Sequence, residues 1–478
     1  MLFNSLDFAI FLPIVFFIYW FLVNKSIKKQ NIVLLVASYV FYGWWDWRFL
    51  SLILFSTIVD YCLGNLMYRT EKVSRQKIFL YTSLFVNLGL LFYFKYCNFF
   101  LDNFINAFSF FGLNFNVSTL KVILPVGISF YTFQTLSYTI DIYRRNLEPA
   151  EDFISFAAFV SFFPQLVAGP IERATNLLPQ FYKRRVFSLE KAKSGLRQIL
   201  WGLFKKIVIA DQCAKYVNII FDNSDGYSGS TLLVGAILFA FQIYGDFSGY
   251  SDIAIGVSRL FGFNLMKNFA FPYFSRDIAE FWRRWHISLS TWFRDYLYIP
   301  LGGSRGGLKM KIRNTFIIFL VSGFWHGANW TFVIWGALNA IYFLPLLLFN
   351  KNRSNMDVIG GKSYIPTFKD FVKMLLTFSL TVFAWIFFRA LNLEHALSYI
   401  VGIFDSTIFS TPEVAPFFLN IYILSFLIIE WFGKNSDYAI EKLFVKRSRV
   451  IRWAFYMLIV FVIIGNVSNQ QDFIYFQF

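Results

Sequence analysis

Three histidines occur in the chain, and His326 lies in the apolar segment 322-SGFWHGANW-330. A neutral imidazole, with an ordinary pKa of about 6.5, can take a proton from a hydroxyl group and return it near neutral pH. Burial favours the neutral form of a histidine, which suits a general base. The residue type therefore fits a catalytic base, with a packed structural histidine and an ion or proton path as alternatives.

Neighbours of His326 could complete such a site. If residues 314–340 form one helix, Asn329 and Trp330 follow His326 by three and four positions and share its face. We therefore expect Asn329 and Trp330 to orient the imidazole. We also expect Asn329 and Trp325 to contact the substrate, together with Arg294 and Asp295 of the segment 276–300.

A second histidine, His286, lies in 276-RDIAEFWRRWHISLSTWFRDYLYIP-300. Aromatic and leucine side chains recur there every three or four positions, while Arg294, Asp295 and two further arginines fall largely on other faces. Tryptophans beside arginines are typical of a helix at the membrane–water boundary. His286 borders the apolar face of this predicted helix, where packing or capping is the alternative to a chemical role.

Two carboxylates, Asp246 and Asp252, lie in the glycine- and hydroxyl-rich segment 242-QIYGDFSGYSDIAIG-256, which apolar residues flank on both sides. Carboxylates at membrane depth are costly, so this segment should line protein or water rather than lipid. A polar cavity wall that contacts substrate and a structural hydrogen-bond network between helices fit equally well.

The loop 301-LGGSRGGLK-309 combines four glycines with Arg305 and Lys309. It lacks the GK[ST] ending and the preceding strand of a phosphate-binding P-loop, so it indicates a flexible basic hinge rather than a nucleotide site.

The third histidine, His395, lies beside Glu394 where a loop enters a helix pattern, and we predict a structural role for it. The cysteines Cys62, Cys97 and Cys213 lie in or beside apolar segments without CxxC spacing. The sequence therefore predicts neither a disulfide framework nor a metal site.

The elements that carry these residues must lie in a membrane. Hydrophobic residues make up 57% of the chain and aromatic residues 22%, more than the interior of a soluble protein can bury. The apolar runs predict an all-α integral membrane protein with 11–13 crossings plus re-entrant or interfacial helices. No linker or fixed repeat divides the chain, so we predict one polytopic membrane domain over residues 1–478.

The positive charges indicate orientation in the membrane rather than nucleic-acid binding. The net charge of +16 lies in loops between apolar runs. The run from Phe8 to Val23 has no basic residue before it, and Lys25 follows it, which predicts a retained first helix with an extracytoplasmic N-terminus. The basic loop 69–77 then falls on the cytoplasmic side.

Seven segments resemble the membrane-bound O-acyltransferase family, in the bacterial branch that acylates alginate, peptidoglycan and teichoic acids. Three carry most of the match: 247-FSGYSDIAIG-256, 281-FWRRWHISLSTWFRDYLYIPLGG-303 and 323-GFWHGANWTFVIWG-336. Four others support it: 125-PVGISFYTFQ-134, 162-FFPQLVAGPI-171, 384-AWIFFRA-390 and 473-FIYFQF-478.

The resemblance implies a ring of tilted helices around a thinned centre, where funnels from both sides meet. His326 matches the family's catalytic histidine, and His286, 40 residues upstream, matches its second polar position. The implied function is transfer of an acyl group, most simply acetyl from a cytoplasmic coenzyme A thioester, to an extracytoplasmic polysaccharide or cell-wall glycan. The implied location is the bacterial inner membrane.

Coenzyme A would be a substrate here, and no bound cofactor is expected. We expect the basic region 276–313 to hold the phosphates of the donor. The resemblance also allows a periplasmic hydrolase-like protein as partner.

Two alternatives stay open: D-alanyl transfer from a carrier protein, and a transporter of a glycan or lipid-linked sugar that uses Asp246 and Asp252 as a polar path. The inverted repeats common in transporters are not evident. Eight cations lie in the basic region: Arg276, Arg283, Arg284, Arg294, Arg305, Lys309, Lys311 and Arg313.

Overall fold

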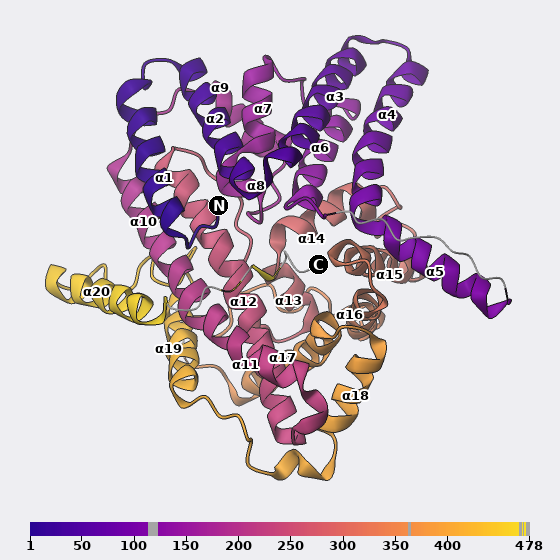
Figure 1. Ribbon diagram of the computed structural model, residues 1–478, viewed down its shortest axis with the longest axis vertical. Helices are drawn as coiled ribbons and strands as arrows, with labels where there is room; N and C mark the ends of the chain where they lie inside the picture. Colours follow the sequence, from indigo (N-terminus) through magenta and orange to yellow (C-terminus); the bar gives the residue numbers. More distant parts are fainter. Residues whose placement is uncertain (113–122, 362–364, 468–470, 472, 475–478) are drawn as a thin grey trace. The chain divides into compact units, whose positions relative to one another are not determined.

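The structure, a computed structural model, describes residues 1–112, 123–361, 365–467, 471, 473 and 474. Every regular element in these ranges is helical, which confirms the predicted all-α class (Figure 1). The chain forms two compact units, one of Met1–Gly195 with Val257–Met266, the other of Leu196–Gly256 with Lys267–Phe478. The prediction of one membrane domain over the whole chain stays a prediction.

The helices up to residue 203 are mostly those of the first unit. Their bounds are α1 Leu6–Phe17, α2 Ile27–Asp46, α3 Leu50–Arg69, α4 Val73–Leu91, α5 Cys97–Phe110, α6 Ile128–Tyr143, α7 Phe153–Ser161, α8 Phe163–Leu166, α9 Ala174–Tyr182 and α10 Leu189–Leu203.

The helices that carry the candidate site follow in the second unit. After the π-helical segment η4 (Phe204–Ala210) come α11 Asp211–Asp222, α12 Gly229–Leu260, α13 Ile278–Arg284, α14 Ile287–Phe293, the π-helical segment η7 (Arg294–Tyr298), α15 Gly307–His326, α16 Trp330–Leu348, α17 Phe368–Arg389, α18 Leu393–Ile403, α19 Phe417–Gly433 and α20 Arg449–Asn466.

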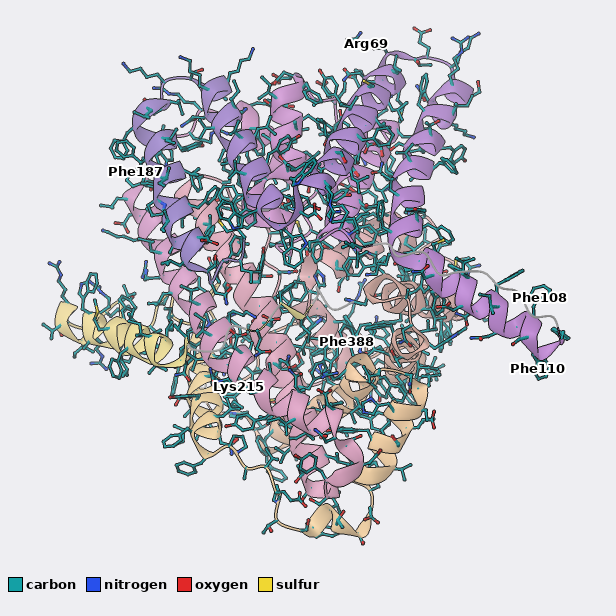
Figure 2. All side chains as sticks on the ribbon, viewed as in Figure 1. Arg69, Phe108, Phe110, Phe187, Lys215 and Phe388 are labelled. Atoms are coloured by element: carbon teal, nitrogen blue, oxygen red, sulfur yellow. The ribbon has the colours of Figure 1, made fainter. Side chains whose placement is uncertain are left out.

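Among the described residues, six helical stretches are long and apolar enough to cross a membrane by length and composition, and four shorter apolar helices accompany them. Many large apolar side chains on these helices face outward, for example Phe110 at the end of α5, which is 87% exposed (Figure 2). Outward apolar surface of this extent suits lipid rather than water. The chain is therefore a multi-pass membrane protein, and the number of 11–13 crossings stays a prediction.

Within the first unit, α3, α4 and α6 are joined by buried polar side chains. Asp60 on α3 accepts hydrogen bonds from Ser83 Oγ (2.6 Å) and Asn87 Nδ2 (2.9 Å) on α4, and Thr135 on α6 donates to Asn87 Oδ1 (3.0 Å). Hydrogen bonds between helices are a common means of association where lipid removes the hydrophobic driving force. These polar residues have a structural explanation and need no substrate.

In the second unit, α12 is the central helix. Of its most apolar stretch, 83% is buried inside the protein, although the helix is long enough to span a bilayer. Aromatic side chains from the following segments pack against it, including Phe269 on Tyr244 at 6.0 Å between ring centres. Apolar composition here therefore reflects burial in protein more than contact with lipid.

Two predicted continuous helices are broken. The predicted interfacial helix over 276–300 divides into α13 and α14, because Trp285 is extended (ψ 128°) and His286 has a left-handed backbone (φ 43°). The predicted helix over 314–340 ends at His326, and Gly327 is extended (φ −160°) before α16 begins. Helix periodicity persists across both breaks, so sequence spacing does not reveal them.

α15 and α16 approach each other closely because glycines face each other across their contact. A Cβ atom at Gly323 would overlap the backbone oxygen of Phe332, and one at Gly336 would overlap the backbone oxygen of Phe319. Small residues that permit backbone contact are typical of helix pairs in membranes. This contact fixes the end of α15, where His326 lies.

We predict that Gly323→Ala destabilises the protein by about 1–3 kcal/mol, the usual cost of overpacking. Thermal unfolding of the purified protein in detergent measures the change. Gly89→Ala on α4 is the control, because no atom lies within 4 Å of the Cβ position there and alanine favours a helix. Equal stability of the two variants would contradict the close contact.

Candidate functional site

The two sequence-predicted histidines lie close together in the second unit. The ring centres of His286 and His326 are 6.5 Å apart, and both side chains are buried, with 1% and 3% exposed. Trp325 contacts both, at 6.2 Å from His286 and 4.9 Å from His326 between ring centres. Residues separated by 40 positions in the sequence therefore share one aromatic-lined site.

The break in the chain at His286 depends on Asn268. The backbone N–H of Ile287 donates to the Asn268 backbone oxygen (2.9 Å), and the N–H and hydroxyl of Ser288 donate to Asn268 Oδ1 (3.3 and 2.8 Å). Asn268 Nδ2 in turn donates to Ser251 Oγ on α12 (3.0 Å). Backbone groups freed by the break thus find partners, as buried polar groups must. A non-glycine residue with positive φ is uncommon and needs such support.

The same asparagine determines which nitrogen of His286 carries hydrogen. His286 Nδ1 lies 3.0 Å from Asn268 Oδ1. That oxygen also accepts the backbone N–H of Ser288, so it is the acceptor, and Nδ1 must be the donor. Burial lowers the pKa of His286 well below its ordinary value, so the ring is neutral and the lone pair is on Nε2.

His326 is the last residue of α15 and is enclosed by aromatic rings from three helices. Besides Trp325, it contacts Trp335 of α16 edge-on at 5.2 Å and Phe388 of α17 at 5.4 Å between ring centres. These rings fix the plane of the imidazole and exclude water around it. An imidazole held in this way can exchange a proton with a bound hydroxyl group without competition from bulk solvent.

Asn329 lies at the helix break and does not share a helical face with His326, so that prediction is wrong. Its Oδ1 caps α16 by accepting the N–H of Thr331 (3.0 Å), and its Nδ2 donates to the backbone oxygen of Leu391 (2.9 Å). Trp330 is half exposed, at 50%. Contact of Asn329 or Trp325 with substrate stays a prediction.

Asp246 and Asp252 form buried ion pairs with lysines of η4. Asp252 Oδ2 lies 2.5 Å from Lys205 Nζ. Asp246 Oδ1 lies 2.8 Å from Lys206 Nζ, and the same ammonium group lies 2.8 Å from Asp211 Oδ1. Pairing of this kind favours the structural alternative for both carboxylates, because a paired and hydrogen-bonded charge is tolerated in an apolar interior.

Arg294 and Asp295 bind each other, with 2.6 Å between Nε and Oδ1. Arg276 and Arg284 both bind Glu280, at 3.0 and 2.5 Å. Several cations predicted to hold donor phosphates thus also brace the protein itself, and binding of substrate by Arg294 and Asp295 stays a prediction. In the described ranges, no three His, Cys, Asp or Glu side chains are grouped to hold a metal ion.

Sequence reasoning missed Asn268, Lys205 and Lys206. Asn268 lies in a loop segment without periodicity, and only its position beside His286 shows its role. The lysines carried a usable signal, because two adjacent charges inside the apolar run 198–221 require partners at membrane depth. The carboxylates of α12 were the available partners.

Comparison with known proteins gives a consistent result. Residues 144–358, which include both histidines, match the membrane-bound O-acyltransferase family. A probable alginate O-acetylase, AlgI, of Pseudomonas aeruginosa is 38% identical over 448 residues, which cover 92% of this chain and 82% of that protein. The peptidoglycan O-acetyltransferase of Helicobacter pylori is 34% identical over 511 residues, which cover 99% of this chain and 92% of that protein. A teichoic acid D-alanyltransferase of Streptococcus thermophilus is 31% identical over 229 residues, which cover 45% of this chain and 55% of that protein.

We predict that Asp252→Asn lowers stability by about 3–5 kcal/mol, because it leaves the Lys205 charge buried without its partner. Replacing both residues, as Lys205→Met with Asp252→Leu, should restore most of the loss, since an apolar pair of similar volume replaces the ion pair. Chemical or thermal unfolding in detergent measures both.

The control is Glu190→Gln, which breaks the exposed pair of Lys193 and Glu190 (3.1 Å). Exposed pairs contribute about 0–1 kcal/mol, so this variant should resemble the wild type. Wild-type stability of Asp252→Asn would show that the carboxylate is not held for structural reasons.

Proposed function

Since this chain belongs to the membrane-bound O-acyltransferase family and is a membrane-embedded O-acyltransferase, we propose that it moves acetyl groups to hydroxyl groups of an extracytoplasmic polysaccharide or cell-wall glycan. The relatives named for alginate and peptidoglycan O-acetylation align with 92% and 99% of this chain. The D-alanyltransferase aligns with 45%. This difference in coverage supports acetyl transfer over D-alanyl transfer.

The observation that carries the proposal is the buried pair of His286 and His326, 6.5 Å apart between ring centres. His326 acts as the general base. Its neutral imidazole takes the proton of the acceptor hydroxyl while the oxygen attacks the thioester carbonyl of the donor. The new ester C–O bond forms, the C–S bond breaks, and the imidazolium returns the proton to the departing thiolate. The step needs no oxidant or reductant.

His286 positions the donor or relays the proton. Asn268 holds Nδ1–H, so the remaining lone pair on Nε2 can accept a hydrogen bond but cannot donate one while the ring is neutral. A hydrogen-bond acceptor held near His326 can bind the thiol or hydroxyl group whose proton is being transferred. A transport path would instead favour mobile charged groups, and the carboxylates Asp246 and Asp252 are already paired with lysines.

The proposal places the protein in the bacterial inner membrane with its N-terminus outside, an orientation that the basic loop 69–77 supports. Acetyl coenzyme A supplies the acyl group from the cytoplasm. Because the acceptor lies on the other side, a periplasmic hydrolase-like protein that receives the acetyl group is the partner that this arrangement suits.

Replacing His326 by alanine should lower acetyl transfer by about 10²–10⁴-fold, the usual contribution of a general acid–base group. The rate is measured with membranes that contain the full-length protein, to which radiolabelled acetyl coenzyme A and the cell's own glycan are added. In cells, the ester content of the extracellular glycan is measured. Polymer export should be unchanged.

His395→Ala is the matched control, because this histidine lies outside the aromatic site and accepts the backbone N–H of Leu391 (3.3 Å). Loss of export together with esters in the His326 variant would favour the transporter alternative. Retained esters would remove His326 from the mechanism. Incorporation of D-alanine in place of acetate would reassign the acyl group.

Asn268→Ala should lower kcat/KM for the donor by about 10–100-fold, because it releases the ring of His286, which positions the donor or relays the proton. The double variant Asn268→Ala with His286→Ala should be no slower than His286→Ala alone, since both act through one ring. Additive losses of rate in the same membrane assay would disprove this coupling.

A further inference from the structure

A cavity of about 400 Å³ lies in the first unit, where the helix formed by α1 and the π-helical turn η1 (Ile18–Leu22) ends. Its lining comes from two stretches that are far apart in the sequence, residues 16–25 and the segment 184–187 between α9 and α10. Five of the lining residues are apolar, and three are cations, so we call it the amphipathic cavity. The cations are Lys25, Arg184 and Arg185.

The two stretches lie side by side, so that aromatic rings line one end of the amphipathic cavity and cations the other. The ring of Phe187 packs edge-on against Trp20 at 5.5 Å and against Phe16 at 6.0 Å between ring centres. Two residues earlier, Nη2 of Arg185 lies 3.5 Å from the backbone oxygen of Ile27, beyond the end of the first helix. A phospholipid has the same polarity, with a charged headgroup joined to apolar chains.

Contacts outside the lining hold both stretches in place. The indole N–H of Trp20 donates to the backbone oxygen of Leu260 (2.9 Å), and Arg185 Nη2 donates to Asn31 Oδ1 (2.6 Å). The guanidinium of Arg185 also lies 5.0 Å from the centre of the Phe263 ring. Because these walls are fixed before a ligand arrives, little ordering is needed on binding, and a single ligand can be held specifically.

Acidic residues do not neutralise the positive charge of the amphipathic cavity. In the described part of the chain, its lining contains three cations and no carboxylate. Arg185 is 7% exposed, and the hydrogen-bond acceptors of its guanidinium are a glutamine, an asparagine and a backbone oxygen, all neutral. Its charge therefore adds to those of the exposed Lys25 and Arg184. This balance of charge favours an anionic ligand.

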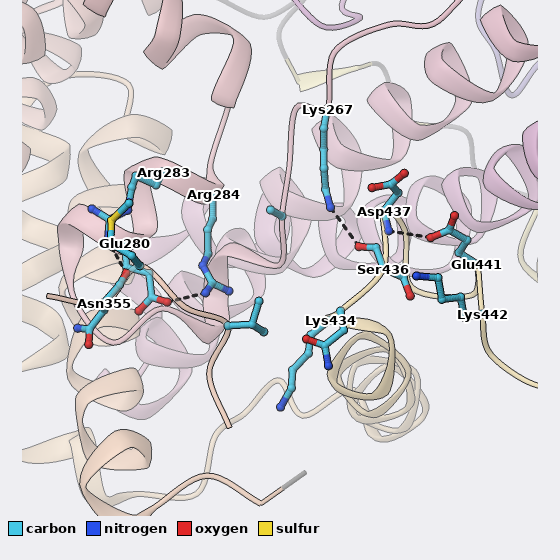
Figure 3. A pocket seen from close by; sticks show the side chains of 14 residues that line it. Lys267, Glu280, Arg283, Arg284, Asn355, Lys434, Ser436, Asp437, Glu441 and Lys442 are labelled. Atoms are coloured by element: carbon cyan, nitrogen blue, oxygen red, sulfur yellow. Dashed lines mark hydrogen bonds and ion pairs between the residues drawn. The ribbon is translucent and has the colours of Figure 1, made fainter. Parts of the chain in front are cut away.

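The pocket beside α13 differs in its charge (Figure 3). Both acidic and basic side chains line it, and Glu280 binds Arg284 there at 2.5 Å. Lys267 donates to the backbone oxygen of Ser436 (3.1 Å). Cations that already have partners in the protein have less to gain from an added anion, so the excess of positive charge distinguishes the amphipathic cavity from this pocket.

The surface around the amphipathic cavity suits the edge of a bilayer. Phe21 and Val186 of the lining are 66% and 75% exposed, and Phe187 is labelled at the edge of the first unit in Figure 2. Exposed apolar residues beside lysine and arginine are typical of the membrane–water interface. A lipid would contact both the cations and the apolar residues, whereas a soluble anion would use only the cations.

We propose that the amphipathic cavity binds an anionic phospholipid, with its phosphate at Lys25, Arg184 and Arg185 and the first part of its acyl chains against Phe21 and Phe187. The volume is within the usual range of about 300–1,000 Å³ for small-molecule sites, which suits a headgroup rather than a whole lipid. The proposed function enters only in the choice of leaflet. With the N-terminus outside, the first helix ends at the cytoplasmic leaflet, where anionic lipids give a negative surface potential.

The test titrates the purified full-length protein in detergent with dioleoyl phosphatidylglycerol and, in parallel, with dioleoyl phosphatidylcholine, which has the same chains and no net charge. Native mass spectrometry counts the bound lipids and gives the Kd of the first one. The first phosphatidylglycerol should bind at least about tenfold more tightly than the first phosphatidylcholine. Glycerol phosphate, which lacks the chains, should bind at least about tenfold more weakly than phosphatidylglycerol.

The variant Lys25→Gln with Arg184→Gln should raise the Kd for phosphatidylglycerol at least about tenfold, because it removes two cations of the lining. Both side chains are exposed, so the fold should be unaffected. Lys72→Gln with Arg75→Gln is the matched control. It removes the same charge from exposed positions of the basic loop 69–77, outside the cavity, and should keep the wild-type Kd.

A second variant, Val186→Glu, places a carboxylate at an exposed position of the lining. It should raise the Kd for phosphatidylglycerol and leave that for phosphatidylcholine unchanged, because only the first lipid carries a net negative charge.

Three results would overturn the proposal. Equal Kd values for the two lipids would remove the preference for an anion. Equal Kd values in the cavity variant and the loop control would show attraction by positive charge in general rather than a site. Binding of glycerol phosphate as tight as that of phosphatidylglycerol would assign the cavity to a soluble phosphate. Protein in detergent without an acyl donor has neither leaflets nor turnover, so failure of the proposed function would leave these measurements unchanged.

Discussion

A helix that stops inside an apolar interior leaves backbone donors that need acceptors, and at His286 those acceptors come from Asn268. Its backbone oxygen accepts Ile287 N–H, and its side-chain oxygen accepts Ser288 N–H. The same side-chain oxygen holds His286 Nδ1 at 3.0 Å. Since one side chain both permits the break and orients the ring, the positive φ of His286 and the tautomer of its imidazole have a common cause.

The position of His326 is determined by helix packing instead. α15 ends at this residue, and glycines allow the backbones of α15 and α16 to touch, as at Gly323 against Phe332. The close contact brings Trp335 of α16 against the imidazole at 5.2 Å between ring centres. The two histidines are therefore each at a helix break, one held by hydrogen bonds and the other by aromatic packing, and neither position requires a flexible loop.

Buried charge in the second unit follows two patterns. Lys205 and Lys206 each lie within 3 Å of a carboxylate oxygen of α12, so their charges are neutralised where they are buried. Lys434 is equally buried but rests on an aromatic ring with an arginine nearby. The first pattern stabilises helix contacts through paired charges, whereas in the second a cation–π contact stands where the other lysines have a carboxylate. Buried lysines in this protein are thus accommodated in two ways, by carboxylates and by an aromatic ring.

The sequence by itself determined the membrane class, the all-helical architecture and the family, because apolar composition and motif residues do not depend on partners distant in the chain. It also singled out His286 and His326, because the residue chemistry of His326 left a base and a packed histidine open and the resemblance to the family then favoured a chemical role for both. Only the tertiary structure decided that the helices break beside them, that Asn329 caps α16, and that lysines of η4 pair with Asp246 and Asp252. Helical periodicity reports neighbours within one helix, whereas a helix break or an ion pair between helices depends on groups that only folding brings together.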